Sequence, residues 1–131
     1  MDSSSIQLAD SEIDSIREDD GSVRIHFSRA YIVKTMTGSA EKTLWWQAGY
    51  LVFDGAELDG PMPETPAVCD GGDVDDNVYT YRDMIPIPLQ SRGRVGCRLR
   101  IRDAAAGVSV TAEAVRLELS DTPKYIRHIR D

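Results

Sequence analysis

The feature that most constrains this chain is a regular alternation of apolar and polar residues in its C-terminal third. Over residues 94–102 every second residue is apolar, and most of the residues between them are arginines. After a connection at 103–107, residues 108–119 resume the alternation. A period of two is typical of a β-strand with one buried and one solvent-exposed face. The two stretches therefore predict a long antiparallel β-hairpin.

The alternation changes parity between Ala112 and Val115, and a similar break lies near Ser28 and Arg29. An extra residue in one strand forms a β-bulge, which bends the strand and lets a sheet curl. The chain has at least six strand-like segments and at most one short helix. We therefore expect an all-β fold in which a curved antiparallel sheet closes into a small barrel, with a two-sheet sandwich as the alternative.

The 131 residues suffice for one domain. Residues 1–9 are largely polar and predict a flexible N-terminal tail whose end can add to the sheet, followed by a single β domain over residues 10–131. Residues 55–77 lack periodicity and contain three prolines with a run of Gly and Asp, which indicates a long central loop.

Two shorter segments have competing interpretations. Residues 12–27 favour a hairpin with its turn at Asp20 and Gly21 over a short helix. Residues 121–129 fit a helix and a last strand equally well, because apolar residues recur there at both spacings.

Charge is distributed unevenly along the chain. The net charge is −7, with 16 acidic and 5 basic residues over 1–81 and 6 acidic and 10 basic residues over 82–131. Because affinity for nucleic acid grows with the number of phosphates neutralised, the acidic excess argues against a nucleic-acid partner. Pairing of opposite charges across neighbouring strands is the simplest consequence.

A stripe of arginines is the first candidate surface. Arg94, Arg98, Arg100 and Arg102 share one face of the predicted strand 94–102. Such a stripe suits phosphates or the carboxylates of a partner. The alternative, which the charge distribution favours, is an exposed face whose arginines pair with acidic residues of the same chain.

The adjacent Trp45 and Trp46 are the second candidate. Neighbours in a strand point to opposite faces, so one tryptophan belongs to the core. The other, with Tyr79 or Tyr81 as companion, is expected either to pack in a second layer or to line a ligand pocket or protein interface.

The central loop supplies a third candidate, a cation site formed by Asp70, Asp73, Asp75 and Asp76. Closely spaced carboxylates beside flexible glycines are the ligands that Ca²⁺ prefers. The spacing fits no known calcium loop, so a solvated acidic loop is the competing interpretation.

Catalysis has little support in the sequence. The two histidines lie in no nucleophile motif, and no pattern indicates a cofactor. We therefore expect a non-catalytic binding or protein-interaction module whose partner is a second copy of itself or another protein. The alternative is a small-ligand barrel, with or without enzymatic activity, whose lid is the loop over 55–77. With only two cysteines and no apolar run long enough to span a membrane, a cytoplasmic protein is expected.

Overall fold

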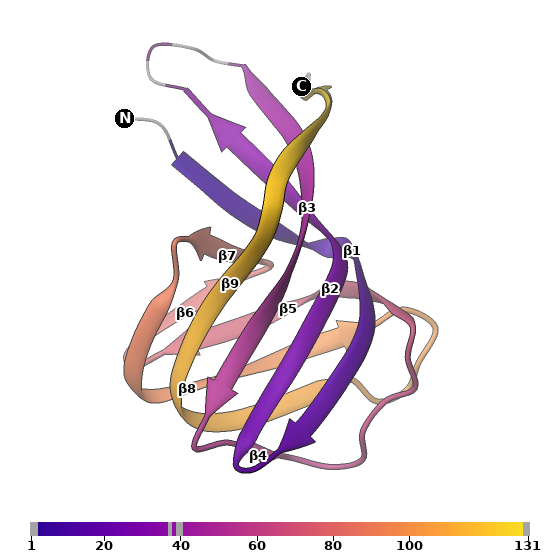
Figure 1. Ribbon diagram of the computed structural model, residues 1–131, viewed down its shortest axis with the longest axis vertical. Helices are drawn as coiled ribbons and strands as arrows, with labels where there is room; N and C mark the ends of the chain where they lie inside the picture. The colour runs from indigo at the N-terminus through magenta and orange to yellow at the C-terminus, as the bar shows by residue number, and fades with distance from the viewer. Residues whose placement is uncertain (1–2, 37, 39–40, 130–131) are drawn as a thin grey trace.

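The computed structural model describes residues 3–36, 38 and 41–129, and over these residues the chain forms nine β-strands and no helix (Figure 1). The strands are β1 (Ser3–Asp19), β2 (Ser22–Thr35), β3 (Lys42–Asp54), β4 (Glu57–Leu58), β5 (Ala67–Asp76), β6 (Tyr79–Arg82), β7 (Met84–Ile87), β8 (Gln90–Ile101) and β9 (Val108–Ile129). They lie in the order β6-β5-β8-β9-β3-β2-β1-β7, with β4 paired to β9.

The antiparallel sheet closes on itself. β1 pairs with β5 through Glu12 opposite Val68 and Ile13 opposite Ala67, which completes a ring of hydrogen-bonded strands β1-β2-β3-β9-β8-β5. This confirms the expected all-β fold with a curved, closing antiparallel sheet.

Both predicted parity breaks coincide with shifts in strand register. β8 and β9 form the expected hairpin, and Arg92 lies opposite Ala114 whereas Val95 lies opposite Ala112. The expected position of the extra residue, between Ala112 and Val115 on β9, is therefore wrong: the extra residue sits on β8, directly across from the parity change. The second shift falls between Phe27 and Ala30, as the sequence predicts. These irregularities bend the strands that form the ring.

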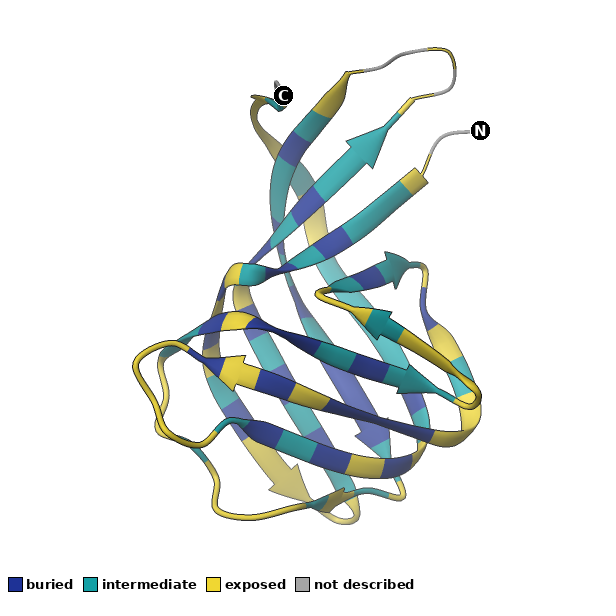
Figure 2. Cartoon of the chain, turned by 180° about the vertical axis from the view of Figure 1, so that it is seen from behind, coloured by how far each residue is buried: buried dark blue, intermediate teal, exposed yellow. Residues whose placement is uncertain are grey.

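Apolar side chains fill the interior of the ring. The largest fully buried side chains there belong to Phe27, Phe53, Ile13, Ile25 and Leu51. Figure 2 shows buried residues alternating with exposed ones along the strands of this part. One face of each strand therefore builds the core, as a period of two requires.

The expectation of a flexible tail over residues 1–9 is wrong for its described part, residues 3–9, while residues 1 and 2 lie outside the described residues. Ile6 and Leu8 are fully buried. Ile6 lies opposite Ile32 of β2 on one side and Ile85 of β7 on the other. Two isolated apolar residues are enough to hold this segment in the sheet because strands flank it on both sides.

The expectation of a loop over 55–77 is also wrong, because the stretch contains β4 and β5. Gly72 lets β5 lie close against β8, since a Cβ there would meet the Arg98 carbonyl oxygen and come within 2.7 Å of the Leu99 Cα. Cys69, which lies in this stretch, is buried and carries a free thiol, as does Cys97. Of the segments left open, 12–27 forms the hairpin turning at Asp20 and Gly21, and 121–129 continues β9 as a strand.

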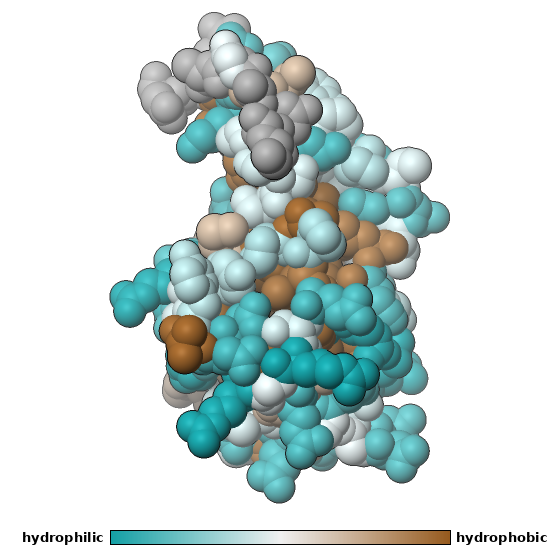
Figure 3. All heavy atoms as spheres, turned by 90° about the vertical axis from the view of Figure 1, so that its left-hand side faces the viewer, coloured by the Kyte–Doolittle hydropathy of each residue, from teal (hydrophilic) through white to brown (hydrophobic). Residues whose placement is uncertain are grey.

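Part of the sheet extends beyond the ring. The upper ends of β1, β2, β3 and β9 project together from it (Figure 1), and we call the described residues 3–9, 29–36, 41–47 and 121–129 the arm. β7 covers one margin of the arm by pairing with residues 4–7 of β1. Figure 3 shows hydrophobic residues gathered where the arm meets the rest of the molecule. One face of the arm is accessible, whereas Ile6, Leu8 and Ile32 on the other face are buried and continue the core.

Candidate functional site

The outer face of the arm is built around Trp46. Strand register places Tyr31 of β2 and Lys124 of β9 opposite it. The Arg29 guanidinium carbon and the Lys124 ammonium nitrogen each lie 4.3 Å from the centroid of the Trp46 ring. These distances are within the range of cation–π attraction. Trp46 therefore holds two cationic groups beside an aromatic surface.

A depression of about 490 Å³ adjoins Trp46. Its lining combines cationic, aromatic and aliphatic side chains from β1, β2, β3 and β9. The lining residues are Gln7, Asp10, Arg29, Tyr31, Leu44, Trp46, Ile126, Arg127 and Ile129. Asp10 is engaged by Arg102, and Arg29 lies 3.8 Å from the Glu12 carboxylate, so Arg127 and the apolar groups give this lining its character.

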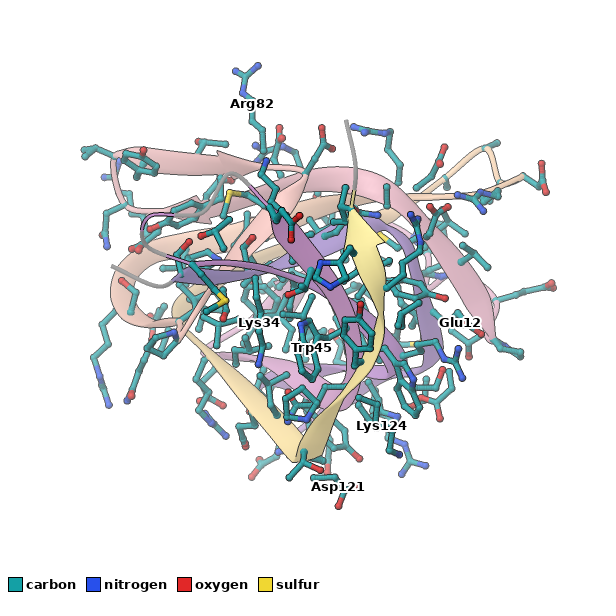
Figure 4. All side chains as sticks on the ribbon, turned by 90° about the horizontal axis from the view of Figure 1, so that it is seen from above. Glu12, Lys34, Trp45, Arg82, Asp121 and Lys124 are labelled. Carbon is teal, nitrogen blue, oxygen red and sulfur yellow. The ribbon has the colours of Figure 1, made fainter. Side chains whose placement is uncertain are left out.

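Trp45 lies on the opposite, inner face of the arm, as expected because adjacent residues of a strand point to opposite faces. Its indole N–H donates to the Thr43 hydroxyl at 2.8 Å, and the Lys34 ammonium lies 4.3 Å from its ring centroid. Figure 4 shows Lys34 and Trp45 side by side. Tyr125 meets the Trp45 ring edge to face at 5.3 Å. Trp45 also packs against the core, so it is the more structural of the two tryptophans.

The arm is basic although the chain is acidic. It contains five Lys or Arg residues and two acidic residues, against a net charge of −7 for the chain. Three large apolar side chains of the arm are also exposed: Met36 (60%), Tyr125 (50%) and Ile126 (37%). Exposed aromatic and aliphatic groups among cations are features of a binding surface.

The predicted arginine stripe is largely neutralised within the chain. Arg98 contacts both oxygens of Asp75, at 2.5 and 3.2 Å, and lies 3.6 Å from Asp73. Arg100 lies 3.1 Å from Asp83. The hydrogen bond from Arg98 holds the pKa of the Asp75 carboxyl below its usual value. The interpretation that these arginines pair with acidic residues of the same chain thus describes most of the stripe.

Arg102 and Arg94, at the two ends of the stripe, have different surroundings. Arg102 pairs with Asp10 and lies 3.3 Å from Asp70. The backbone N–H of Arg94 donates to the Asn77 side chain at 3.1 Å. Arg102 also adjoins accessible apolar residues, Met62 among them, but it is engaged by Asp10 and Asp70.

The acidic residues proposed as metal ligands are engaged by other groups. Asp70, Asp73 and Asp75 face arginines, and the Asp76 carboxylate accepts from the Ser91 hydroxyl at 2.5 Å. Within the described residues no group of three or more His, Cys, Asp or Glu side chains is arranged to hold a metal ion. The Asp-rich segment thus acts as the acidic partner of the arginine stripe.

Tyr79 and Tyr81 lie on β6, at the other end of the strand order from β1 and β7, with ring centroids 5.0 Å apart. The aromatic companions of the tryptophans are instead Tyr31 and Tyr125. Tyr125 was not predicted because it belongs to segment 121–129, whose helix or strand identity was open, and the sequence gives no register that places Tyr31 opposite Trp46.

His26 is the histidine with the most developed surroundings. Its Nδ1 contacts the Asp14 carboxylate, and its ring centroid lies 4.4 Å from that of Tyr50. The depression here, about 550 Å³, is lined by Asp14, Ser15, Arg17, Asp19, Arg24, His26 and Tyr50. The mixed charges of this lining define no single ligand chemistry.

Comparisons with protein-family models, with curated proteins and with solved structures find no match for this chain. In the portion of the chain that the structure describes, no helix has the length and apolar character needed to cross a bilayer. The function must therefore be argued from the geometry of the arm.

Proposed function

We propose that this chain is a non-catalytic interaction module that binds an acidic segment of another protein on the outer face of its arm. The observation that supports this most directly is Trp46, whose ring lies between Arg29 and Lys124 beside the depression. Tryptophan and arginine are the residues most enriched among those that dominate binding energy at protein interfaces.

Charge supports an acidic partner. The cations of the arm lie in a chain whose net charge is −7, so a partner carboxylate gains attraction at the arm and meets repulsion over the acidic surfaces elsewhere. The exposed Ile126 and the Trp46 ring supply apolar contact area between these cations. The apolar contacts thus position the partner segment, and the cations favour a segment with negative charge.

Two alternatives have less support. A ligand site inside the ring needs a cavity, whereas the buried apolar cluster occupies that interior. Nucleic acid suits basic and aromatic surfaces, but its extended phosphate backbone would also meet the acidic remainder of the molecule. We place the module in the cytoplasm, which agrees with two free, buried thiols.

The test is a calorimetric titration of the protein, at low salt, with an acetylated, amidated hexapeptide of alternating Glu and Val. We expect binding that weakens about tenfold or more in Trp46→Ala, since a central aromatic anchor is removed. Arg29→Gln and Lys124→Gln should each weaken binding several-fold while the fold, checked by circular dichroism, is unchanged. Tyr79→Ala, an exposed aromatic residue on β6, is the matched control and should bind normally.

Three outcomes would overturn the proposal. The first is no binding of the acidic peptide, and the second is binding that Trp46→Ala and both charge variants leave intact. The third is equal binding of a hexapeptide with Lys in place of Glu. A single-stranded oligonucleotide that binds more tightly than the peptide, with the same dependence on Trp46, would assign the surface to nucleic acid instead.

A further inference from the structure

β9 has one unpaired edge along the arm. It lies between β8 and β3 in the sheet, but its pairing with β8 ends at Arg116, followed by a last backbone hydrogen bond from Leu117 N–H to the Leu89 carbonyl at 2.9 Å. Pairing with β3 continues to Ile129. Among the described residues, β9 beyond Leu117 therefore has a strand neighbour on one side only.

The edge most open to a partner strand is 124–129. β9 bends at Asp121, which has a positive φ of 62°, and Pro123 has no backbone N–H to donate. Figure 4 shows this bend, with Lys124 following it. From Lys124 to His128 every residue is exposed. Exposed strand edges of this kind present backbone donors and acceptors that readily pair with another strand.

The two faces of this edge differ in chemistry. Register places Lys124 opposite Trp46 and Arg127 opposite Leu44, so both cations lie on the outer face of the arm. Tyr125 lies opposite Trp45 and His128 opposite Thr43, on the inner face. A strand added here would find cations on one face and an aromatic surface on the other.

We infer that the acidic partner segment binds as an added β-strand along residues 124–129 of β9, with carboxylates on the outer face and apolar residues on the inner face. This inference rests on the proposed function and specifies its binding mode: Trp46 holds Lys124 on the outer face, where the carboxylates bind, and Tyr125 meets the apolar residues on the inner face. Six residues of strand span about 20 Å, so a hexapeptide is long enough to pair with the whole edge. In strand addition the main chain supplies affinity, and alternate side chains supply specificity.

The inference has a test that separates it from the proposed function. In a strand, alternate N–H groups point to opposite edges, so N-methylation of the odd or the even residues of the Glu-Val hexapeptide blocks one edge at a time. Strand addition predicts that one methylated set loses about tenfold or more in affinity and that the other binds within about twofold of the parent peptide. When the parent peptide binds, amide hydrogen exchange should slow at those residues of 124–129 whose N–H points away from β3, with the alternation interrupted by the register shift between Tyr125 and Arg127.

Equal affinity of both methylated peptides and the parent would overturn strand addition and leave the proposed function standing. Equal loss with both sets, or unchanged exchange over 124–129, would also overturn it. Failure of the unmethylated peptide to bind would reject the proposed function itself. If light scattering shows a dimer whose 124–129 amides are protected without peptide, the edge belongs to a second copy of this chain.

Discussion

Replacing Ile6 by Ala should destabilise the protein strongly, although Ile6 is only the sixth residue of the sequence. Its side chain is fully buried, and its cross-strand neighbours Ile32 and Ile85 are at most 1% exposed. Both neighbours belong to strands hydrogen-bonded to β1, so they have little freedom to move into a cavity. The substitution removes three carbon atoms.

The size of the effect follows from these contacts. Three buried carbons contribute about 2.4 kcal/mol at roughly 0.8 kcal/mol each, and the cavity left by rigid neighbours raises the expected loss to about 3–4 kcal/mol. For a chain of 131 residues this corresponds to a melting temperature lower by about 12 °C.

Urea unfolding followed by tryptophan fluorescence measures this loss, with an m-value that should match that of the unmodified protein. Ser5→Ala is the matched control, because Ser5 is the half-buried neighbour with its side chain on the opposite face, and it should change stability by less than about 0.5 kcal/mol. If Ile6→Ala also changes stability by less than 0.5 kcal/mol, β1 does not begin where we place it.

Three other predictions concern β5 and β8. Gly72→Ala should destabilise the protein by at least about 2 kcal/mol in urea unfolding, because a Cβ there meets backbone of β8, whereas Gly60→Ala, with a positive φ but nothing within 4 Å, should cost only about 1 kcal/mol. Equal losses of stability in Gly72→Ala and Gly60→Ala would contradict the close approach of β5 to β8 at Gly72. Because the pKa of Asp75 is lower in the folded state, its stabilising contribution is present above the unfolded value of about 4 and is lost as the pH falls through the folded pKa. Asp75→Asn should therefore lower stability at pH 7 by at most about 1 kcal/mol, given how exposed its arginine partner is, with the difference shrinking below about pH 4; a difference that grows toward acid would contradict it. Burial raises the pKa of the Cys69 thiol to about 11 and that of Cys97 further. Neither should react with a thiol reagent at pH 8 until the protein is unfolded, so rapid labelling of the native protein would refute their burial.

The sequence was informative where local pattern alone determines structure. The alternation over 94–102 and 108–119 identified the buried faces of β8 and β9, and the parity breaks located both register shifts. The opposite orientation of Trp45 and Trp46 likewise needs only the geometry of a strand. None of these inferences depends on which residues distant in the sequence lie side by side.

The errors arose where long-range pairing outweighs local preference. Residues 67–76 contain Gly and Asp, which disfavour strands, yet β5 forms because its backbone pairs with β8 and its carboxylates meet the arginines there. Trp46 meets Lys124 only because β3 pairs with β9 across two register irregularities, which the sequence did not reveal. The sequence did not predict the basic outer face of the arm for the same reason.

Net charge was therefore a poor guide to the surface available for binding. Arg98, Arg100 and Arg102 formed the most conspicuous cationic pattern in the sequence, but the fold places an acidic residue of the same chain against each of them. Lys124 and Arg127 were inconspicuous, but the fold sets them beside exposed apolar groups and along an unpaired strand edge. A cation that is already paired offers a partner little net attraction, because a new contact must replace an existing one. The binding capacity of such a chain thus depends on the charges that folding leaves beside accessible apolar surface.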